Sequence, residues 1–168
     1  MPETIALLAF VTLQRLSELF WSQRNEARLR EMGAVEVGAG HYPVMVGLHA
    51  AWLAAMWTAG WNHPLVGFFT VLYLIVQVGR AWVLWTLGRR WTARVLVVPG
   101  ETLVKRGPYR FLNHPNYVVV GLEIVLLPLA LNLQVLAVLF GAANLVMLFW
   151  RIRAENRALA TAAPRNPG

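Results

Sequence analysis

The chain has 168 residues, of which 58% are hydrophobic and only 14% are charged. This apolar content is too high for an ordinary soluble domain and predicts an all-α integral membrane protein built from helices of about 20 residues. The absence of cysteine excludes disulfide bonds, thiolate metal sites and a cysteine nucleophile. Lysine and arginine number 15 against 8 acidic residues, which gives a net charge of +7.

Five apolar stretches predict five transmembrane helices. The first, from about Thr4 to Trp21, lacks a charged n-region and a small-residue cleavage site, so we expect a retained helix and no signal peptide. Tight turns at residues 61–64 and 131–134 make the second and third helices, and the fourth and fifth, antiparallel neighbours. The later stretches run from about Tyr42 to Gly60, Leu65 to Leu87, Asn116 to Leu131 and Leu133 to Trp150.

The basic residues predict how the helices are oriented. Of the 15 lysines and arginines, all except Arg15 and Arg80 lie in the first connection, the third connection or the tail after Trp150. Cytoplasmic loops collect such residues, so we expect a multi-pass protein of the bacterial inner membrane with its N-terminus outside and its C-terminus in the cytoplasm. Contact with anionic lipids therefore explains the positive charge, and nucleic-acid binding is not expected.

The third connection, residues 88–115, is the longest one. Residues 95–98, followed by Pro-Gly, predict a short extended segment and a turn. Gly107-Pro108 and His114-Pro115 enclose a basic, aromatic run and stiffen it, because proline disfavours helix in the residue before it. A helix that begins near Pro115 has its N-terminus beside Arg110 and His114, which suits a ligand carboxylate. The alternative is a basic loop that only anchors the bundle to lipid headgroups.

Ionisable residues elsewhere add further candidates. Arg151 and Glu155 share a face if the fifth helix continues past the membrane surface, either as a solvated pair or as part of a site. Burial in lipid is costly, so charged residues within the spans are functional candidates. Glu18 and Arg15 are spaced to form a self-neutralising pair, with a role in substrate binding as the alternative. Glu123 faces either a substrate cavity or a partner such as Arg80.

Three features together carry a resemblance to a known family. They are the run Arg106-Gly107-Pro108-Tyr109-Arg110-Phe111-Leu112-Asn113-His114-Pro115-Asn116-Tyr117, an apolar helical hairpin, and Arg151-x-x-x-Glu155-Asn156-x-x-Leu159. Over about residues 88–160 the chain resembles the isoprenylcysteine carboxyl methyltransferase family. The resemblance implies a methyltransferase that uses S-adenosyl-L-methionine without a Rossmann domain, and the chain has no glycine-rich dinucleotide fingerprint.

The resemblance also implies roles for individual residues. The predicted cofactor-binding residues are Tyr109, Arg110, His114, Pro115, Tyr117 and Glu155. Arg151 and Glu155 are the catalytic candidates, and Arg80 and Glu123 are the substrate candidates. Asn156 stands where the family usually has a second acidic residue.

The domain organisation follows from the same reading. We expect one membrane domain over residues 1–168, with three spans in 1–87, the cofactor-binding loop, hairpin and tail in 88–160, and a disordered tail at 161–168. The run Gly38 to Pro43 resembles bacterial members associated with type III polyketide synthases. That likeness implies O-methylation of the acidic ring hydroxyl of a long-chain pyrone. The resemblance to the wider family leaves the carboxylate of a prenylcysteine-like molecule as the other lipophilic acceptor.

Two other readings compete with a methyltransferase. Sterol reductases of related architecture also carry His-Pro-Asn-Tyr and bind NADPH, so a membrane reductase is the alternative enzyme. A non-catalytic membrane subunit or small transporter is the alternative from another class. The histidines outside the motif, His41, His49 and His63, lack metal-ligand spacing, so no metal site is expected.

Overall fold

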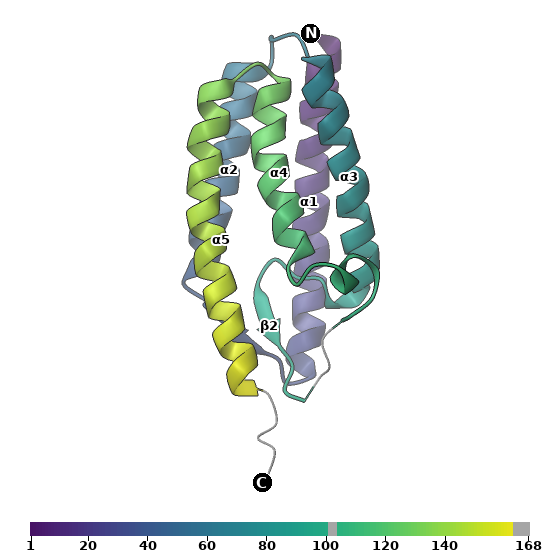
Figure 1. Cartoon of the computed structure of the whole chain (residues 1–168), viewed down its shortest axis with the longest axis vertical. Coiled ribbons are helices and arrows are strands. Elements are labelled where there is room, and N and C mark those ends of the chain that lie inside the picture. The colour runs from purple at the N-terminus through teal and green to yellow at the C-terminus, as the bar shows by residue number, and fades with distance from the viewer. Residues whose placement is uncertain (101–103, 163–168) are drawn as a thin grey trace.

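The computed structural model describes residues 1–100 and 104–162 (Figure 1). This part of the chain contains five long helices, and the expected all-α membrane architecture is confirmed. They are α1 (Pro2–Glu31), α2 (His41–Gly60), α3 (Gly67–Leu87), α4 (Pro115–Ala130) and α5 (Gln134–Ala162). The connections contain strands β1 (Val35–Val37) and β2 (Val95–Val97) and the 3-10 helices η1 (Gly88–Arg90) and η2 (Gly107–Arg110).

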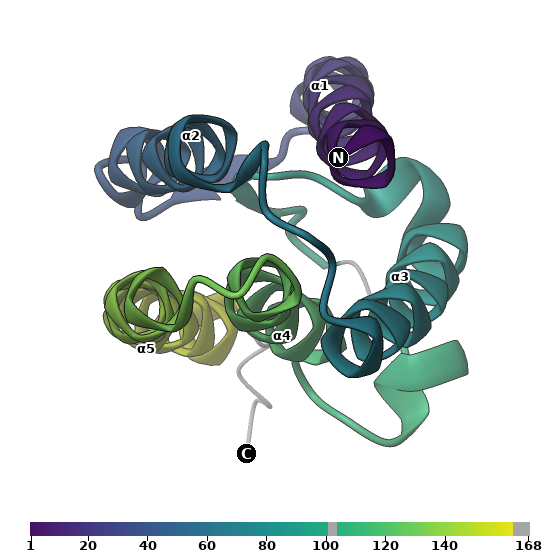
Figure 2. The same cartoon turned by 90° about the horizontal axis from the view of Figure 1, so that it is seen from above.

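The long helices form two layers. Seen from above, α1 and α2 lie in one layer, opposite α3, α4 and α5 in the other (Figure 2). α4 lies between α3 and α5 and packs against both. The start of α1 and the end of α5 lie at opposite ends of the bundle, as an odd number of antiparallel long helices requires (Figure 1). The strands lie toward the end of the bundle where α1 and α5 end.

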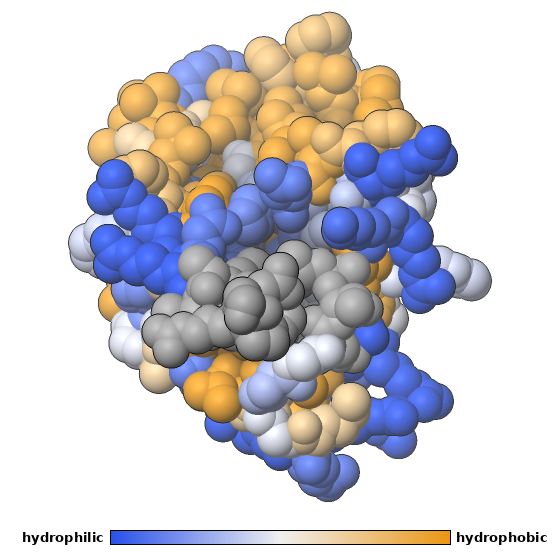
Figure 3. All heavy atoms as spheres, turned by 60° about the horizontal axis from the view of Figure 1, so that its bottom comes forward, coloured by the Kyte–Doolittle hydropathy of each residue, from blue (hydrophilic) through white to orange (hydrophobic). Residues whose placement is uncertain are grey.

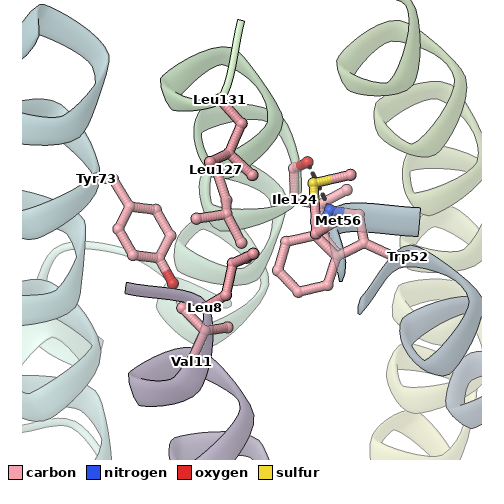
Figure 4. Close-up of a cluster of buried hydrophobic side chains, with 8 residues drawn as sticks. All are labelled: Leu8, Val11, Trp52, Met56, Tyr73, Ile124, Leu127 and Leu131. Carbon is pink, nitrogen blue, oxygen red and sulfur yellow. Dashed lines mark hydrogen bonds between the residues drawn. The ribbon is translucent and has the colours of Figure 1, made fainter. Parts of the chain in front are cut away.

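The apolar core joins both layers. Trp52 of α2 donates its indole N–H to the carbonyl oxygen of Ile124 in α4 at 3.1 Å. Pro128 lies four residues after Ile124 and has no N–H, so the indole satisfies a carbonyl that lacks its usual helical partner. This hydrogen bond therefore fixes α2 against α4 within the apolar core. The core is a cluster of buried side chains from both layers: Leu8, Val11, Trp52, Met56, Tyr73, Ile124, Leu127 and Leu131 (Figure 4).

The outer surface of the bundle suits lipid. α1, α3 and α5 are long and apolar enough to cross a membrane. α4 has only 16 residues, and crossing by all five helices stays a prediction. Large apolar side chains point outward along the bundle and form a surface that water would not favour. They include Phe10, Leu13, Phe20, Ile75, Val78, Trp82, Val138 and Leu145.

The end of the bundle where α1 and α5 end is polar and basic. In Figure 3, hydrophilic side chains gather over this end, and the apolar surface lies behind them. The exposed cations of this end come from the end of α1, the third connection and α5, and include Arg24, Arg28, Arg89, Lys105, Arg106 and Arg153. Their position on one end is the pattern expected from the positive-inside rule.

Two features of this end differ from the sequence-based expectation. α1 continues ten residues past Trp21 to Glu31, because its polar residues there are buried by the third connection. Asn25, for example, donates to the carbonyl oxygens of Gly88 at 3.2 Å and Trp91 at 2.7 Å. The strand β1 was not expected, and it pairs antiparallel with β2, whose extended conformation is confirmed.

The last helix confirms another expectation. α5 runs without interruption through Arg151 and Glu155, so both side chains belong to one helix. Residues 161 and 162 form its last positions, and the remainder of the expected tail, 163–168, lies outside the described residues.

Candidate functional site

Two adjoining cavities open where the helices meet the third connection. The polar cavity has a volume of about 960 Å³ and is lined by β2, η2, the start of α4 and the end of α5. The apolar cavity has a volume of about 250 Å³ and lies among α1, α2, α4 and α5, with Arg80 of α3 at its edge. Both cavities share five lining residues, which therefore form the boundary between them: Trp91, Thr92, Asn116, Tyr117 and Arg151.

The proline-flanked run folds as its residues predict. Gly107 adopts a φ of 57°, and a side chain at this position would overlap Thr86 of α3. η2 follows, and the Phe111 N–H closes it by donating to the Pro108 carbonyl at 3.1 Å. His114 is the N-cap residue of α4, which begins at Pro115. The run is thereby held against α3 at one end and becomes α4 at the other.

Glu155 of α5 contacts two residues of this run. The Tyr117 hydroxyl donates to the Glu155 carboxylate at 2.7 Å, and Nδ1 of His114 lies 3.7 Å from the same oxygen. The His114 and Tyr117 rings stack with their centroids 5.3 Å apart. Three residues expected to hold one ligand therefore form one contact group on the wall of the polar cavity.

Tyr109 adds a neutral hydroxyl to this wall. Burial, followed by the negative charge of the nearby Glu155, raises the pKa of the Tyr109 phenol above its ordinary value of 10.0. The phenol therefore stays protonated at neutral pH and can donate a hydrogen bond into the cavity.

Arg151 lies on the boundary between the cavities and is only 6% exposed. Its Nη2 donates to the Ala93 carbonyl at 2.7 Å, and its Nη1 faces the Met45 sulfur. The guanidinium carbon lies 5.7 Å from the centroid of the Tyr117 ring. Among the described residues its Nε has no hydrogen-bond partner, so a buried cation keeps one free N–H. In the same part of the chain Glu155 is held by Tyr117 and His114, and no ion pair joins it to Arg151.

A second group of charges lies deeper in the bundle. Arg80 binds both carboxylates, because its Nη1 lies 2.7 Å from Glu123 and its Nη2 contacts Glu18. Arg15 also contacts both, at 2.8 Å from Glu123 and 3.5 Å from Glu18. The expected partnership of Glu123 with Arg80 is confirmed, and the expected pair of Arg15 and Glu18 is part of this larger group. Two cations and two anions balance within what we call the buried quartet.

The cavities account for most of the predicted site residues. The polar cavity is lined by Tyr109, Arg110, His114, Tyr117, Arg151, Glu155 and Asn156. Pro115 is buried beneath it as the first residue of α4 and does not line it. Arg80 lines the apolar cavity, whereas Glu123 is 0% exposed and lines neither cavity. Sequence reasoning missed the boundary residues Trp91, Thr92 and Asn116, although Asn116 lies within the recognised run.

Comparison with known proteins identifies the family. The sequence pattern of the isoprenylcysteine carboxyl methyltransferase (ICMT) family matches residues 68–161, more than half of the chain. The chain belongs to the ICMT family. The uncharacterized protein YpbQ of Bacillus subtilis (strain 168) is 39% identical over 162 residues, which cover 91% of this chain and 94% of YpbQ. No solved structure matches the chain significantly.

The ICMT match covers the polar cavity and only part of the apolar one. All residues that line the polar cavity lie within 68–161 except Leu29. The apolar cavity takes about half of its wall from α1 and α2, which precede the match. Membership of the ICMT family, together with the apolar helices, makes this chain a membrane protein of a methyltransferase family.

Proposed function

We propose that this ICMT family member is an integral membrane enzyme that transfers a methyl group from S-adenosyl-L-methionine to an oxygen of a lipophilic acceptor. The acceptor oxygen belongs to a carboxylate or to an acidic ring hydroxyl, as in a prenylcysteine-like molecule or a long-chain pyrone. The observation that carries the proposal is the shared boundary of the two cavities at Asn116, Tyr117 and Arg151. A water-borne donor and a lipid-borne acceptor can meet at such a boundary.

The polar cavity fits a cofactor of this kind. Its volume of about 960 Å³ is at the upper end of the range for small-molecule sites. The cofactor carries an ammonium, a carboxylate and ribose hydroxyls. Glu155 is the anion suited to the ammonium or the ribose, and Arg110 with the N-terminus of α4 is suited to the carboxylate. Tyr109 and Tyr117 supply aromatic surface and hydroxyl groups.

The residues at the boundary are suited to binding and orienting the acceptor. The cofactor supplies a methyl group on a sulfonium, so the new carbon–oxygen bond forms while the carbon–sulfur electron pair stays on sulfur. An acceptor that is already ionised needs no strong base. Arg151 offers a buried positive charge with a free N–H to hold that anion, and its contacts with Ala93 and Met45 fix its position. The chain's contribution is then orientation and exclusion of water.

The proposal includes an orientation in the membrane. The basic end of the bundle, which carries the polar cavity, faces the cytoplasm of the bacterial inner membrane, and the N-terminus faces outward. Soluble cofactor then reaches the polar cavity directly, while the acceptor stays among the helices.

Methyl transfer from labelled S-adenosyl-L-methionine tests the proposal. The purified enzyme is offered prenylated cysteine, long-chain pyrones and resorcinols, fatty acids and phosphatidylethanolamine. We expect a labelled product with an oxygen acceptor and loss of product in Arg151→Gln. Arg153→Gln is the matched control, because Arg153 lies on the same helix, contacts Phe149 and lines neither cavity. Tight binding of NADPH without binding of S-adenosyl-L-methionine would favour a reductase. Full function with alanine at Arg110, His114 and Glu155 would favour a non-catalytic subunit.

A further inference from the structure

The apolar cavity contains polar atoms that the proposed methyl transfer does not use. Asn144 of α5 is 1% exposed, and its Oδ1 has no hydrogen-bond partner among the described residues. The Nε of Arg15 in α1 is buried and equally unpartnered within that part of the chain. Both residues line the apolar cavity. Buried polar atoms are nearly always satisfied, so these two point to a ligand group that completes them.

The position of Asn144 separates it from the site of methyl transfer. Asn144 and Arg151 are seven residues apart on α5 and therefore share a face, with Asn144 about 10 Å deeper along the helix axis. Asn144 packs beside Gly121 of α4, where an added Cβ would lie 3.9 Å from its Nδ2. A ligand that reaches Arg151 at one end of the cavity can thus reach Asn144 with a different group.

The guanidinium of Arg15 is held in place by the buried quartet. Its Nη2 contacts Glu123 at 2.8 Å and its Nη1 lies 3.5 Å from Glu18. Its Nε–H then remains as a donor of fixed position beside an apolar wall. Asn144 Oδ1 is an acceptor and Arg15 Nε is a donor, and both residues line the same small cavity, so a single occupant that both donates and accepts can satisfy the two. A hydroxyl does this, whereas a ketone or carboxylate oxygen leaves Asn144 unpaired.

We propose that Asn144 and Arg15 form a second polar contact for the acceptor and bind a hydroxyl that is distinct from the methylated oxygen. The inference rests on the proposed function and adds a specificity-determining residue, Asn144. The cavity volume of about 250 Å³ exceeds the roughly 150 Å³ that holds benzene, so it has room for a compact head group with more than one polar substituent. A plain hydrocarbon chain leaves both polar atoms unpaired and is therefore a poor occupant.

The test compares two acceptors that differ by one hydroxyl. A fatty acid with a hydroxyl a few carbons from its carboxylate is compared with the fatty acid of the same length that lacks it, because both carboxylates are ionised at neutral pH. We expect the wild-type enzyme to prefer the hydroxylated acid by about tenfold or more in kcat/KM, because the plain acid leaves two buried polar atoms unpaired. Asn144→Leu removes one of these two atoms and should reduce the preference severalfold. Met147→Leu is the matched control, because Met147 lines the same cavity and is also buried, and it should keep the preference.

Each outcome decides the inference. A wild-type ratio close to one, or a preference that is unchanged in Asn144→Leu, would overturn the inference. The same holds if neither compound is methylated by an enzyme that accepts another molecule of the panel. The wild-type comparison needs no variant, and unchanged affinity for S-adenosyl-L-methionine shows that Asn144→Leu is folded. Absence of transfer to every acceptor would instead contradict the proposed function itself.

Discussion

Replacing Glu123 by glutamine removes one charge from the buried quartet and should destabilise the bundle strongly. The Glu123 carboxylate is 0% exposed and accepts hydrogen bonds from Gln77 at 2.8 Å, Arg15 at 2.8 Å and Arg80 at 2.7 Å. The glutamine is nearly isosteric but leaves two cations facing one remaining anion, Glu18. The effect therefore comes from charge balance and not from a cavity.

The expected size follows from the burial of the group. Breaking a buried ion pair by removing one partner costs about 3 to 5 kcal/mol, because the remaining charge is uncompensated. One kcal/mol shifts the melting temperature by roughly 2 to 4 °C in a chain of this length, so Glu123→Gln should lower it by roughly 6 to 20 °C. Adding Arg15→Gln restores neutrality, and the double variant should lose less than the sum of the singles by about 1 kcal/mol or more.

Thermal unfolding of the detergent-purified protein, followed by circular dichroism, provides the measurement. Glu31→Gln is the matched control, because Glu31 is exposed at the end of α1, and it should leave the melting temperature nearly unchanged. A shift of no more than a couple of degrees in Glu123→Gln, or strict additivity in the double variant, would refute the idea that the quartet is stabilised by charge balance.

Three further predictions concern the site, the topology and the strand pair. Tyr117→Phe removes the hydroxyl that donates to Glu155, so it should weaken binding of S-adenosyl-L-methionine by roughly tenfold or more. Calorimetry measures this affinity, and an unchanged value would show that the contact is not part of the cofactor site. Because the chain has no cysteine, single cysteines at Asn62 and Arg89 can be labelled selectively, and we expect an impermeant reagent to reach only position 62 in intact cells; the reverse pattern would invert the topology. Burial raises the pKa of Glu36, but hydrogen bonds from its two arginine partners outweigh this and hold the pKa below its ordinary value of 4.5. The stability that Glu36 gives to the strand pair is therefore full above pH 4.5 and is lost as the pH falls through the lowered pKa. Hydrogen-exchange protection factors of the amides of residues 35–37 and 95–97 should drop only in that acidic range, and a loss already at neutral pH would contradict this.

Hydropathy and turn residues were sufficient to predict the five long helices and the two tight turns. The expected span from Tyr42 to Gly60 differs by one residue from α2, and the turns at 61–64 and 131–134 lie where the apolar runs are interrupted. The lower part of α1 was not predicted, because Asn25 and Glu26 are polar and a hydropathy count treats them as a connection. Their burial depends on contacts with residues 88–94, which are far away in the sequence.

The sequence brought distant site residues together only through the family resemblance, because spacing alone left the basic loop and the Arg151–Glu155 pair open to other readings. The resemblance implied one pocket for the run around His114 and for Arg151 and Glu155, and these residues line one cavity. Strand β1 has three residues and exists through its pairing with β2, which no local pattern in 35–37 shows. Asn144 was not singled out from the sequence, because only the packing of α5 against α4 and α2 buries it and leaves its side-chain oxygen unpartnered among the described residues.

The two cavities take their lining residues from different parts of the chain, and this has a consequence for how related proteins can differ. Residues 1–67 precede the segment that matches the ICMT family, yet they supply Leu19, Met45, His49 and Leu53 to the compartment proposed for the acceptor. If the proposed function holds, changes in this portion alter the acceptor range while the polar cavity proposed for the donor stays intact. An exchange of the first two helices between family members, with Arg80 and Glu123 kept as matching partners of the quartet, should therefore change which acceptors are methylated.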